Sequence, residues 1–142
     1  AYEFAREMIG LRSRYTSLRP AEYFTGQDRW GTGLKNVTWY AADGNELAGY
    51  GWSDPWNHFL GYRIDAHADA GATGVRSIYV AYSWHHRFVE IVLPPAAGGR
   101  RWVRMADTAE WLEHAGNVDR NETVIERQYG LHERSVAIFL EK

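Results

Sequence analysis

The residues of this sequence best suited to contact a ligand are aromatic, and they gather around one turn. The segment KNVTWYAADGNELAGYGW, residues 35–52, surrounds an Asp-Gly pair with four large rings: Trp39, Tyr40, Tyr50 and Trp52. Tryptophan and tyrosine combine a large apolar area with a polar group, so such rings can stack on a sugar or fill a core. Three interpretations are open: a sugar-binding surface, a catalytic loop, or an ordinary hairpin whose rings belong to the core.

Residues of catalytic type are present, but they lack the spacings that mark catalytic sites. The sequence has no Gly-x-Gly-x-x-Gly motif, no phosphate-binding loop ending in Gly-Lys-Ser/Thr and no Gly-x-Ser-x-Gly motif. Glycoside hydrolysis needs two carboxylates at a set separation, and no pair stands out; Glu90 is expected on the solvent side of a strand. Aspartate is common in turns because its side chain bonds the local backbone. Six aspartates fit that structural role: Asp28, Asp43, Asp54, Asp65, Asp69 and Asp107.

The adjacent residues His85 and His86 are the strongest metal candidates and follow Trp84 in an expected turn. Neighbouring side chains on an extended segment point in opposite directions, so the two rings should not share a ligand. A zinc site also needs further ligands at regular spacing, and the other histidines are scattered. We therefore expect an exposed polar turn, no metal site and no cofactor.

Composition indicates one packed domain and argues against several classes of partner. The chain has 142 residues, of which 45% are hydrophobic and 24% charged, as is typical of a globular domain. A net charge of −2 provides no basic stripe for nucleic acid, and the apolar runs are too short to span a membrane. The sequence has no cysteine and shows no signal peptide, so we expect no disulfides and a cytoplasmic location.

The elements that must position these residues begin with a helix over residues 1–18. Its apolar side chains recur at intervals of four and three residues and so share one face: Phe4, Met8, Leu11, Tyr15 and Leu18. Pro20 marks the end of the helix. Because the apolar stripe is wide, the helix needs a broad partner surface.

From Glu22 onward the pattern changes to short β-prone runs separated by turn residues. A short helix is expected at 109–116, and the expected strands are 37–40, 58–66, 77–84, 87–93, 101–108, 124–129 and 135–141. Residues 84–87 should form a hairpin turn, and the last two strands should pair with each other. Successive strands with hairpin-sized gaps indicate an antiparallel sandwich or barrel. We predict a mainly β fold, one amphipathic helix followed by an antiparallel β-sandwich.

Six segments of the chain follow one another in an order found in one enzyme family. They are FAREMIGLRSRYTSLRPAEYF, VTWYAADGNEL, FLGYRID, SIYVAYSW, LPPAAGGRRWVRMADT and YGLHERSVAIFLEK. Together they resemble the C-terminal part of isoamylase-type and glycogen-debranching enzymes of glycoside hydrolase family 13. The first resembles the last helix of their (β/α)₈ barrel, the second the segment after it, and the others the strands of their Greek-key-like C-terminal β domain. Two positions depart from the pattern, since Ser83 stands where the family usually has Asn and Tyr15-Thr16 where it has His-Pro.

The resemblance implies that the catalytic residues of the parent enzyme lie outside this chain. In that family they are two aspartates and a glutamate on the barrel, which needs about 250 residues, and no position here matches them. The chain then divides into residues 1–20, the last barrel helix; 21–56, an aromatic- and glycine-rich connection; and 57–142, the C-terminal β-sandwich. The implied function is that of a non-catalytic domain of an enzyme that hydrolyses α-1,6-glucosidic bonds in glycogen or starch. It would stabilise the barrel and shape the glucan cleft.

Two other functions remain open: an independent α-glucan-binding module and a small hydrolase that acts alone. In the binding module, five rings would form an exposed platform: Trp39, Tyr40, Tyr50, Trp52 and Trp56. Of these, Trp39 is expected to pack against the barrel or the sandwich, and Tyr50 and Trp52 to face solvent or sugar. Without a barrel, the apolar stripe of the first helix should fold back on the β domain, pair with a second copy, or cause association.

Overall fold

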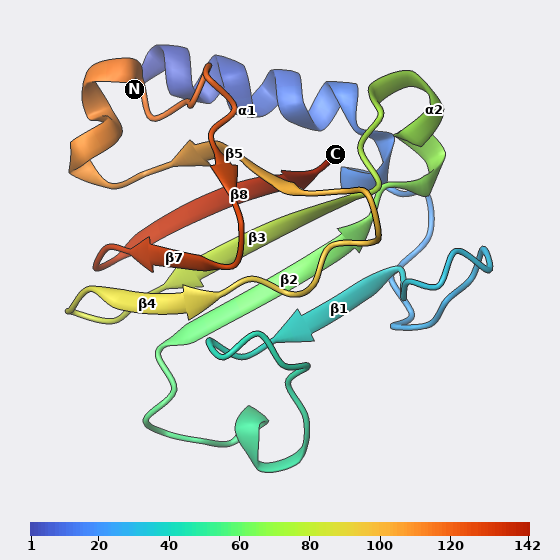
Figure 1. Cartoon of the computed structure of the whole chain (residues 1–142), viewed down its shortest axis with the longest axis horizontal. Helices are drawn as coiled ribbons and strands as arrows, with labels where there is room; N and C mark the ends of the chain where they lie inside the picture. The colour runs from blue at the N-terminus through green and yellow to red at the C-terminus, as the bar shows by residue number, and fades with distance from the viewer.

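The computed structural model describes all residues from Ala1 to Lys142 and shows three layers: helix α1, a six-stranded antiparallel sheet and a two-stranded sheet (Figure 1). The α-helices and strands are α1 (Tyr2–Arg14), β1 (Val37–Tyr40), β2 (Phe59–Asp65), α2 (Ala70–Thr73), β3 (Ser77–Ser83), β4 (Val89–Val92), β5 (Trp102–Asp107), β6 (Val124–Ile125), β7 (Gln128–Leu131) and β8 (Ser135–Glu141). Four 3₁₀ helices complete the chain: η1 (Thr16–Leu18), η2 (Gly49–Trp52), η3 (His67–Asp69) and η4 (Glu110–Ala115). The predicted antiparallel β-sandwich with a leading helix is confirmed.

The main sheet has the strand order β1-β2-β3-β8-β5-β6, and β4 pairs with β7 in the second sheet. Two predicted pairings are wrong. Residues 84–87 do not form a hairpin turn, because β4 crosses to the second sheet, where Ile91 and the following Leu93 are buried between the sheets. The run 124–129 does not pair with β8, because it is divided between β6 and β7, and β8 instead pairs with β3 and β5.

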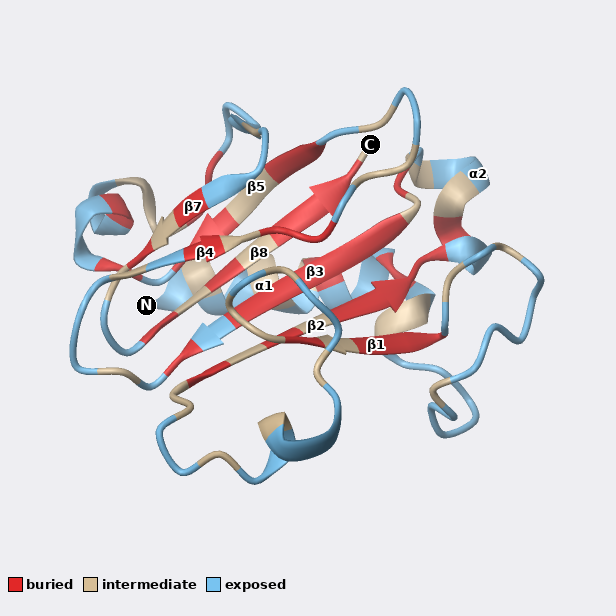
Figure 2. Ribbon diagram, turned by 60° about the horizontal axis from the view of Figure 1, so that its bottom comes forward, coloured by how far each residue is buried: buried red, intermediate tan, exposed pale blue.

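The core between the two sheets is dominated by aromatic residues. Figure 2 shows that much of the central strands of the main sheet is buried. The ring centroid of Phe139 on β8 lies 4.9 Å from that of Tyr129 on β7 and 6.2 Å from that of Tyr79 on β3. Trp102 on β5 is also fully buried there, and its indole N–H donates to the carbonyl of Pro94 at 2.7 Å. Six of the chain's 21 aromatic residues belong to this core, where large rings bury the most area per residue, and eleven others are exposed.

The opposite face of the main sheet carries α1. Leu11 and Tyr15 of the predicted stripe are buried against Ile78 and Val80, which point to this side of β3 because side chains alternate along a strand. Two further residues of the stripe pack partly buried against the same cluster: Met8 and Leu18. Of the three expected fates of the helix face, the structure has the first, in which it folds back on the β domain.

Helix α1 ends four residues earlier than predicted, at Arg14. Tyr15 is extended, with φ −106° and ψ 100°, and the carboxylate of Asp69 accepts backbone and hydroxyl hydrogen bonds from Thr16 and Ser17 at 2.7–3.1 Å. A contact distant in sequence therefore ends the helix before Pro20 is reached. Neither α1, at 13 residues, nor any other helix has the length and apolarity needed to cross a bilayer.

Two other segments differ in detail from their predicted form. Strand β1 pairs with β2 along its whole length, with Val37 opposite Ile64 and Tyr40 opposite Gly61. The main sheet therefore begins inside residues 21–56, the segment expected to be a connection. The helix expected at 109–116 is the 3₁₀ helix η4.

Candidate functional site

Three aromatic side chains meet at the β1 edge of the main sheet. The ring centroid of Trp39 lies 5.9 Å from that of Trp52, edge to face, and 5.6 Å from that of Tyr62. We call these three residues the β1 aromatic cluster. Its Trp52 side chain is 55% exposed, so the cluster offers a ring surface to a ligand or to another domain.

Strand alternation separates the two adjacent rings of β1. Trp39 lies opposite Tyr62 in the register of β1 and β2, on the face of the sheet that carries α1. Tyr40 points to the other face, where its ring packs 5.8 Å from Tyr79 in the core and only 9% of the residue is exposed. Tyr40, a predicted platform residue, is therefore core and offers no open ring.

The other predicted platform residues lie on the loop between β1 and β2. Tyr50 and Trp56 are 71% and 82% exposed, and no aromatic contact joins either of them to Trp39 or Trp52. Trp52 lies at the end of the 3₁₀ helix η2, where a Cβ on Gly51 would come within 2.6 Å of Leu47 Cδ1, so that a larger residue would require Leu47 to move. The structure thus unites Trp39 with Trp52 and leaves Tyr50 and Trp56 separate.

An open groove of about 320 Å³ borders the β1 aromatic cluster. Its size lies at the lower limit of typical ligand sites. The lining is mostly apolar and comes from two segments: Phe24, Thr25, Gly26, Val37, Trp39, Tyr62 and Ile64. Phe24, which no sequence pattern singled out, also lines two adjacent hollows beside Trp30. The β1 edge is therefore a continuous, shallow aromatic surface.

The loop that supplies Phe24 is fixed by polar contacts. The side-chain amide oxygen of Asn36 accepts hydrogen bonds from the backbone N–H groups of Thr25 and Gly26, and Asn36 is only 2% exposed. The hydroxyl of Thr32 donates to the Asp65 carboxylate at the end of β2 at 2.5 Å. These bonds hold one wall of the groove in place without a regular element.

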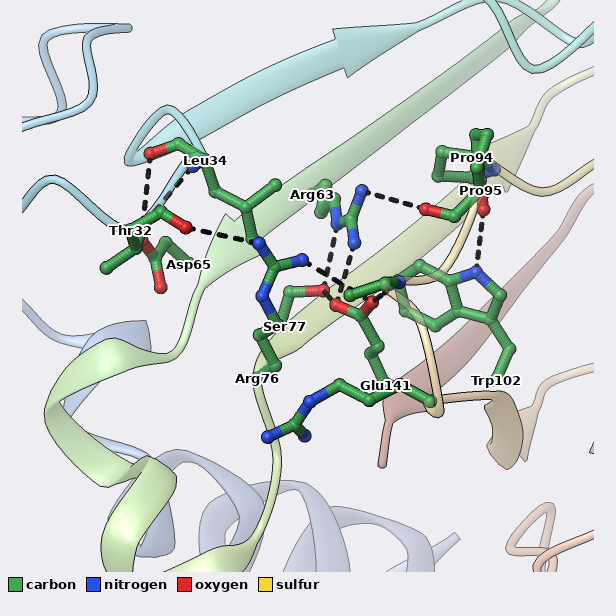
Figure 3. A network of polar contacts seen from close by, with 12 residues as sticks. Thr32, Leu34, Arg63, Asp65, Arg76, Ser77, Pro94, Pro95, Trp102 and Glu141 are labelled. Carbon is green, nitrogen blue, oxygen red and sulfur yellow. Dashed lines mark hydrogen bonds and ion pairs between the residues drawn. The ribbon is translucent and has the colours of Figure 1, made fainter.

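A buried ion-pair network lies on the opposite face of β2 (Figure 3). Glu141 accepts hydrogen bonds at 2.7 Å from Arg63, Ser77 and the backbone N–H of Ala97, and Arg76 lies 3.6 Å away. Burial acts to raise the pKa of Glu141, but the Ala97 N–H and the Arg63 guanidinium outweigh it and lower that pKa. With both oxygens occupied, this carboxylate is equipped to hold strands together rather than to exchange a proton with a substrate.

Five of the six aspartates serve local structure, as predicted. Their carboxylates accept hydrogen bonds from backbone N–H groups close in sequence: Asp28 from Thr32 and Gly33, Asp43 from Asn45, Asp54 from Trp56, Asp65 from His67, and Asp107 from Ala109. For Asp69 the prediction is wrong, because its carboxylate bonds Thr16 and Ser17, more than fifty residues away in the sequence. Tyr129 also donates its hydroxyl to Asp107. Glu90 is exposed, as predicted. The arrangement does not single out two carboxylates facing each other across an open cleft.

The histidine pair differs from its predicted geometry. The rings of His85 and His86 do not point apart but stack, with centroids 4.8 Å apart and an angle of 17° between planes. The chain leaves strand β3 at Ser83, so the alternation of an extended strand no longer applies to them. The ring centroid of His58 lies 5.0 Å from that of His85. Even so, no group of three metal-ligating side chains in the structure has the geometry to hold an ion.

A second set of exposed rings lies away from the predicted site. It includes Trp111 on η4, which is 39% exposed, and Phe88 before β4, which is 56% exposed. The sequence did carry a signal for Trp111, because it stands beside Leu112 and adjacent helical positions point about 100° apart, so one of the two tends to lie nearer the solvent. Leu112 is the buried one, at 6% exposed.

Comparisons with known proteins agree with this architecture. The family model described as "Isoamylase, C-terminal" matches residues 36–140, from the residue before β1 to the penultimate residue of β8. The chain is 29% identical to an isoamylase of Flavobacterium sp over 144 aligned residues, which cover 98% of this chain and 18% of the relative. It is 34% identical over 108 residues to the chloroplastic isoamylase 2 of Oryza sativa subsp. japonica, covering 75% of this chain and 13% of the relative. The chain thus spans less than a fifth of the length of these relatives.

Proposed function

Because this chain belongs to the isoamylase C-terminal domain family, we propose that it acts as the non-catalytic C-terminal domain of a glycogen- or starch-debranching hydrolase. The parent enzyme of family 13 would hydrolyse α-1,6-glucosidic bonds on a catalytic barrel. The observation that carries the proposal is that the family match includes every strand of the sandwich, from the residue before β1 to the penultimate residue of β8. The engagement of the carboxylates in structural hydrogen bonds supports a non-catalytic role.

The face of the main sheet beside α1 is suited to pack against that barrel. If residues 1–20 form the last barrel helix, the barrel lies on the side of α1, and so does the β1 aromatic cluster. On the same face, Tyr82 of β3 is 45% exposed and Val136 and Ile138 of β8 are only partly covered. Burial of such apolar area stabilises a contact between domains by about 25 cal/mol per Å².

The stability of the two-domain enzyme tests this role. In the isolated chain, Tyr82→Ser should change the melting temperature little, because the ring is already half exposed. In the enzyme that carries this chain, the same substitution should lower the melting temperature of the catalytic domain. An equal effect in both proteins would contradict the proposed contact.

An α-glucan-binding role is the second candidate, and the exposed Trp52 beside Trp39 and the open groove favours it. Tryptophan fluorescence of the chain with added maltoheptaose measures this directly. A saturable change that Trp52→Ala removes would support glucan binding at the β1 aromatic cluster. If millimolar maltoheptaose causes no response, the structural role is the only one of these two functions that remains. Release of reducing ends from glycogen by the chain itself would instead identify a stand-alone hydrolase, and we expect none.

A further inference from the structure

A row of three rings crosses the edge of the sandwich opposite the β1 aromatic cluster. The centroid of His132 lies 5.4 Å from that of Phe88 and 6.5 Å from that of Trp111. The strand order places β1 at one edge of the main sheet and β5 and β6, which flank η4 in sequence, at the other. We call Phe88, His132 and Trp111 the distal aromatic row, and it shares no residue with the cluster already described.

The Trp111 ring is held in a fixed orientation although it is 39% exposed. The guanidinium of Arg104 lies over it, 4.7 Å from the ring centroid. Arg104 is itself fixed by Asp119, whose carboxylate oxygen lies 2.8 Å from Nε and 2.6 Å from Nη2, and by the Thr123 hydroxyl at 3.3 Å. One face of the indole is therefore backed by a cation whose charge Asp119 neutralises.

Phe88, at the other end of the row, lies against the backbone of β7. A side chain at Gly130 would overlap the Phe88 ring, since a Cβ there would lie 2.7 Å from Cε2. Glycine at this point of β7 lets the ring lie directly against the strand backbone. A ring that is backed by other groups, as Trp111 is by Arg104, loses little conformational entropy when a ligand binds, which favours affinity.

Polar groups flank the aromatic row on both sides. Trp111 and Arg104 line both of two open hollows of about 390 and 310 Å³, which lie at the lower end of the range of small-molecule sites. Gln128 and His132 line the smaller hollow, and Asn121 and Thr123 line the larger. These amide, imidazole and hydroxyl groups donate and accept hydrogen bonds without adding a fixed net charge.

We propose that the distal aromatic row is a binding site for a neutral oligosaccharide, with a sugar ring stacked on Trp111. A pyranose has an apolar face of C–H groups and a rim of hydroxyls, so the face buries area on the indole while the hydroxyls reach the flanking polar side chains. An anionic ligand is disfavoured because both arginines that line the hollows are already paired, Arg104 with Asp119 and Arg120 with Glu7. The identification of the sugar as an α-glucan rests on the proposed function. The glucan would bind at the edge of the sheet opposite the β1 aromatic cluster.

Indole N–H signals in nitrogen-15 correlation spectra of the full chain test the site, because each of the seven tryptophans gives its own signal. With maltoheptaose as the probe, the Trp111 signal should shift saturably. Trp111→Ala should weaken binding at least about tenfold. Gln128→Ala should also weaken maltoheptaose binding. Because Gln128 occupies an exposed strand position, this second variant tests the site even if Trp111→Ala does not fold. Trp84→Ala, which removes a ring of matched 42% exposure outside the row, should leave the affinity unchanged.

Two outcomes would overturn the distal site. Shifts confined to the signals of Trp39 and Trp52 would assign glucan binding to the β1 aromatic cluster instead. If no indole signal shifts at millimolar maltoheptaose, the chain does not bind this glucan at either site. Neither result affects the proposed support of the catalytic domain, because that role is measured by the melting temperature of the two-domain enzyme.

Discussion

The carboxylate of Glu141, one residue before the end of the chain, lies 2.7 Å from the guanidinium of Arg63 on β2, and both side chains are almost fully buried. Strand β3 lies between their two strands, and its Ser77 completes the link by donating to Glu141 and accepting from Arg63 Nε at 2.9 Å. One ion pair thus joins three strands of the main sheet at the level where the chain ends.

Glu141→Gln should lower the free energy of unfolding by about 3–5 kcal/mol, because it leaves the Arg63 charge buried without its partner. Guanidinium chloride denaturation measures the change. The matched control is Glu46→Gln, which breaks an exposed ion pair with Lys35 and should cost less than about 1 kcal/mol. Similar losses for both variants would show that the buried pair has no special structural weight.

Asp69 should make the stability of the fold depend on acidity. Desolvation acts to raise its pKa, but the hydrogen bonds from Ser17 and Thr16 outweigh it and hold the pKa below its ordinary value. The unfolded chain therefore binds the proton more readily, and the stabilisation present above about pH 4 is lost as the pH falls through the folded-state pKa. Unfolding free energies measured at several pH values should decline less steeply toward acid in Asp69→Asn. An unchanged slope would contradict this assignment.

Gly61→Ala should destabilise the chain by about 1–3 kcal/mol, since the added Cβ would overlap the buried Tyr79 hydroxyl. That hydroxyl has no hydrogen-bond partner in the structure, so Tyr79→Phe alone should be neutral or stabilising. Combining the two substitutions should recover part of the loss, because the overlapping oxygen is removed. Strictly additive effects in the double-mutant cycle would exclude the steric explanation.

Leu11→Ala should detach α1 from the sheet and cost about 2–5 kcal/mol, because Leu11 is 5% exposed in the cluster under the helix. The uncovered sheet face should also promote self-association, visible as a concentration-dependent rise in apparent mass. Ile9→Ala, on the same helix but 67% exposed, is the control and should change both quantities little.

The local pattern of the sequence was sufficient for the positions of most elements. The alternation of Leu60, Tyr62 and Ile64 predicted strand β2, and the structure places Tyr62 on the face that meets α1. The local pattern was not sufficient for the connections between strands. A short apolar strand such as β4 has the same sequence pattern whether it pairs with the preceding strand as a hairpin or crosses to a second sheet. The burial of Ile91 among residues from distant strands decided that choice.

The same limit applied to the candidate site. Alternation requires Trp39 and Tyr40 to point to opposite faces, but both faces of this sheet are apolar, so the pattern could not say which ring stays open. Trp52 reaches Trp39 only through the loop carrying η2, and Trp111 meets His132 only through the packing of two sheets.

The sequence by itself determined the apolar stripe of α1, the succession of strands and the family to which the chain belongs, because periodicity and motif order are properties of neighbouring residues. Only the tertiary structure decided which rings are buried, which are exposed and which meet. Exposure depends on what lies above each face. Helix α1 covers part of one face of the main sheet, the second sheet covers the other face, and the edges at Trp52 and Trp111 stay open.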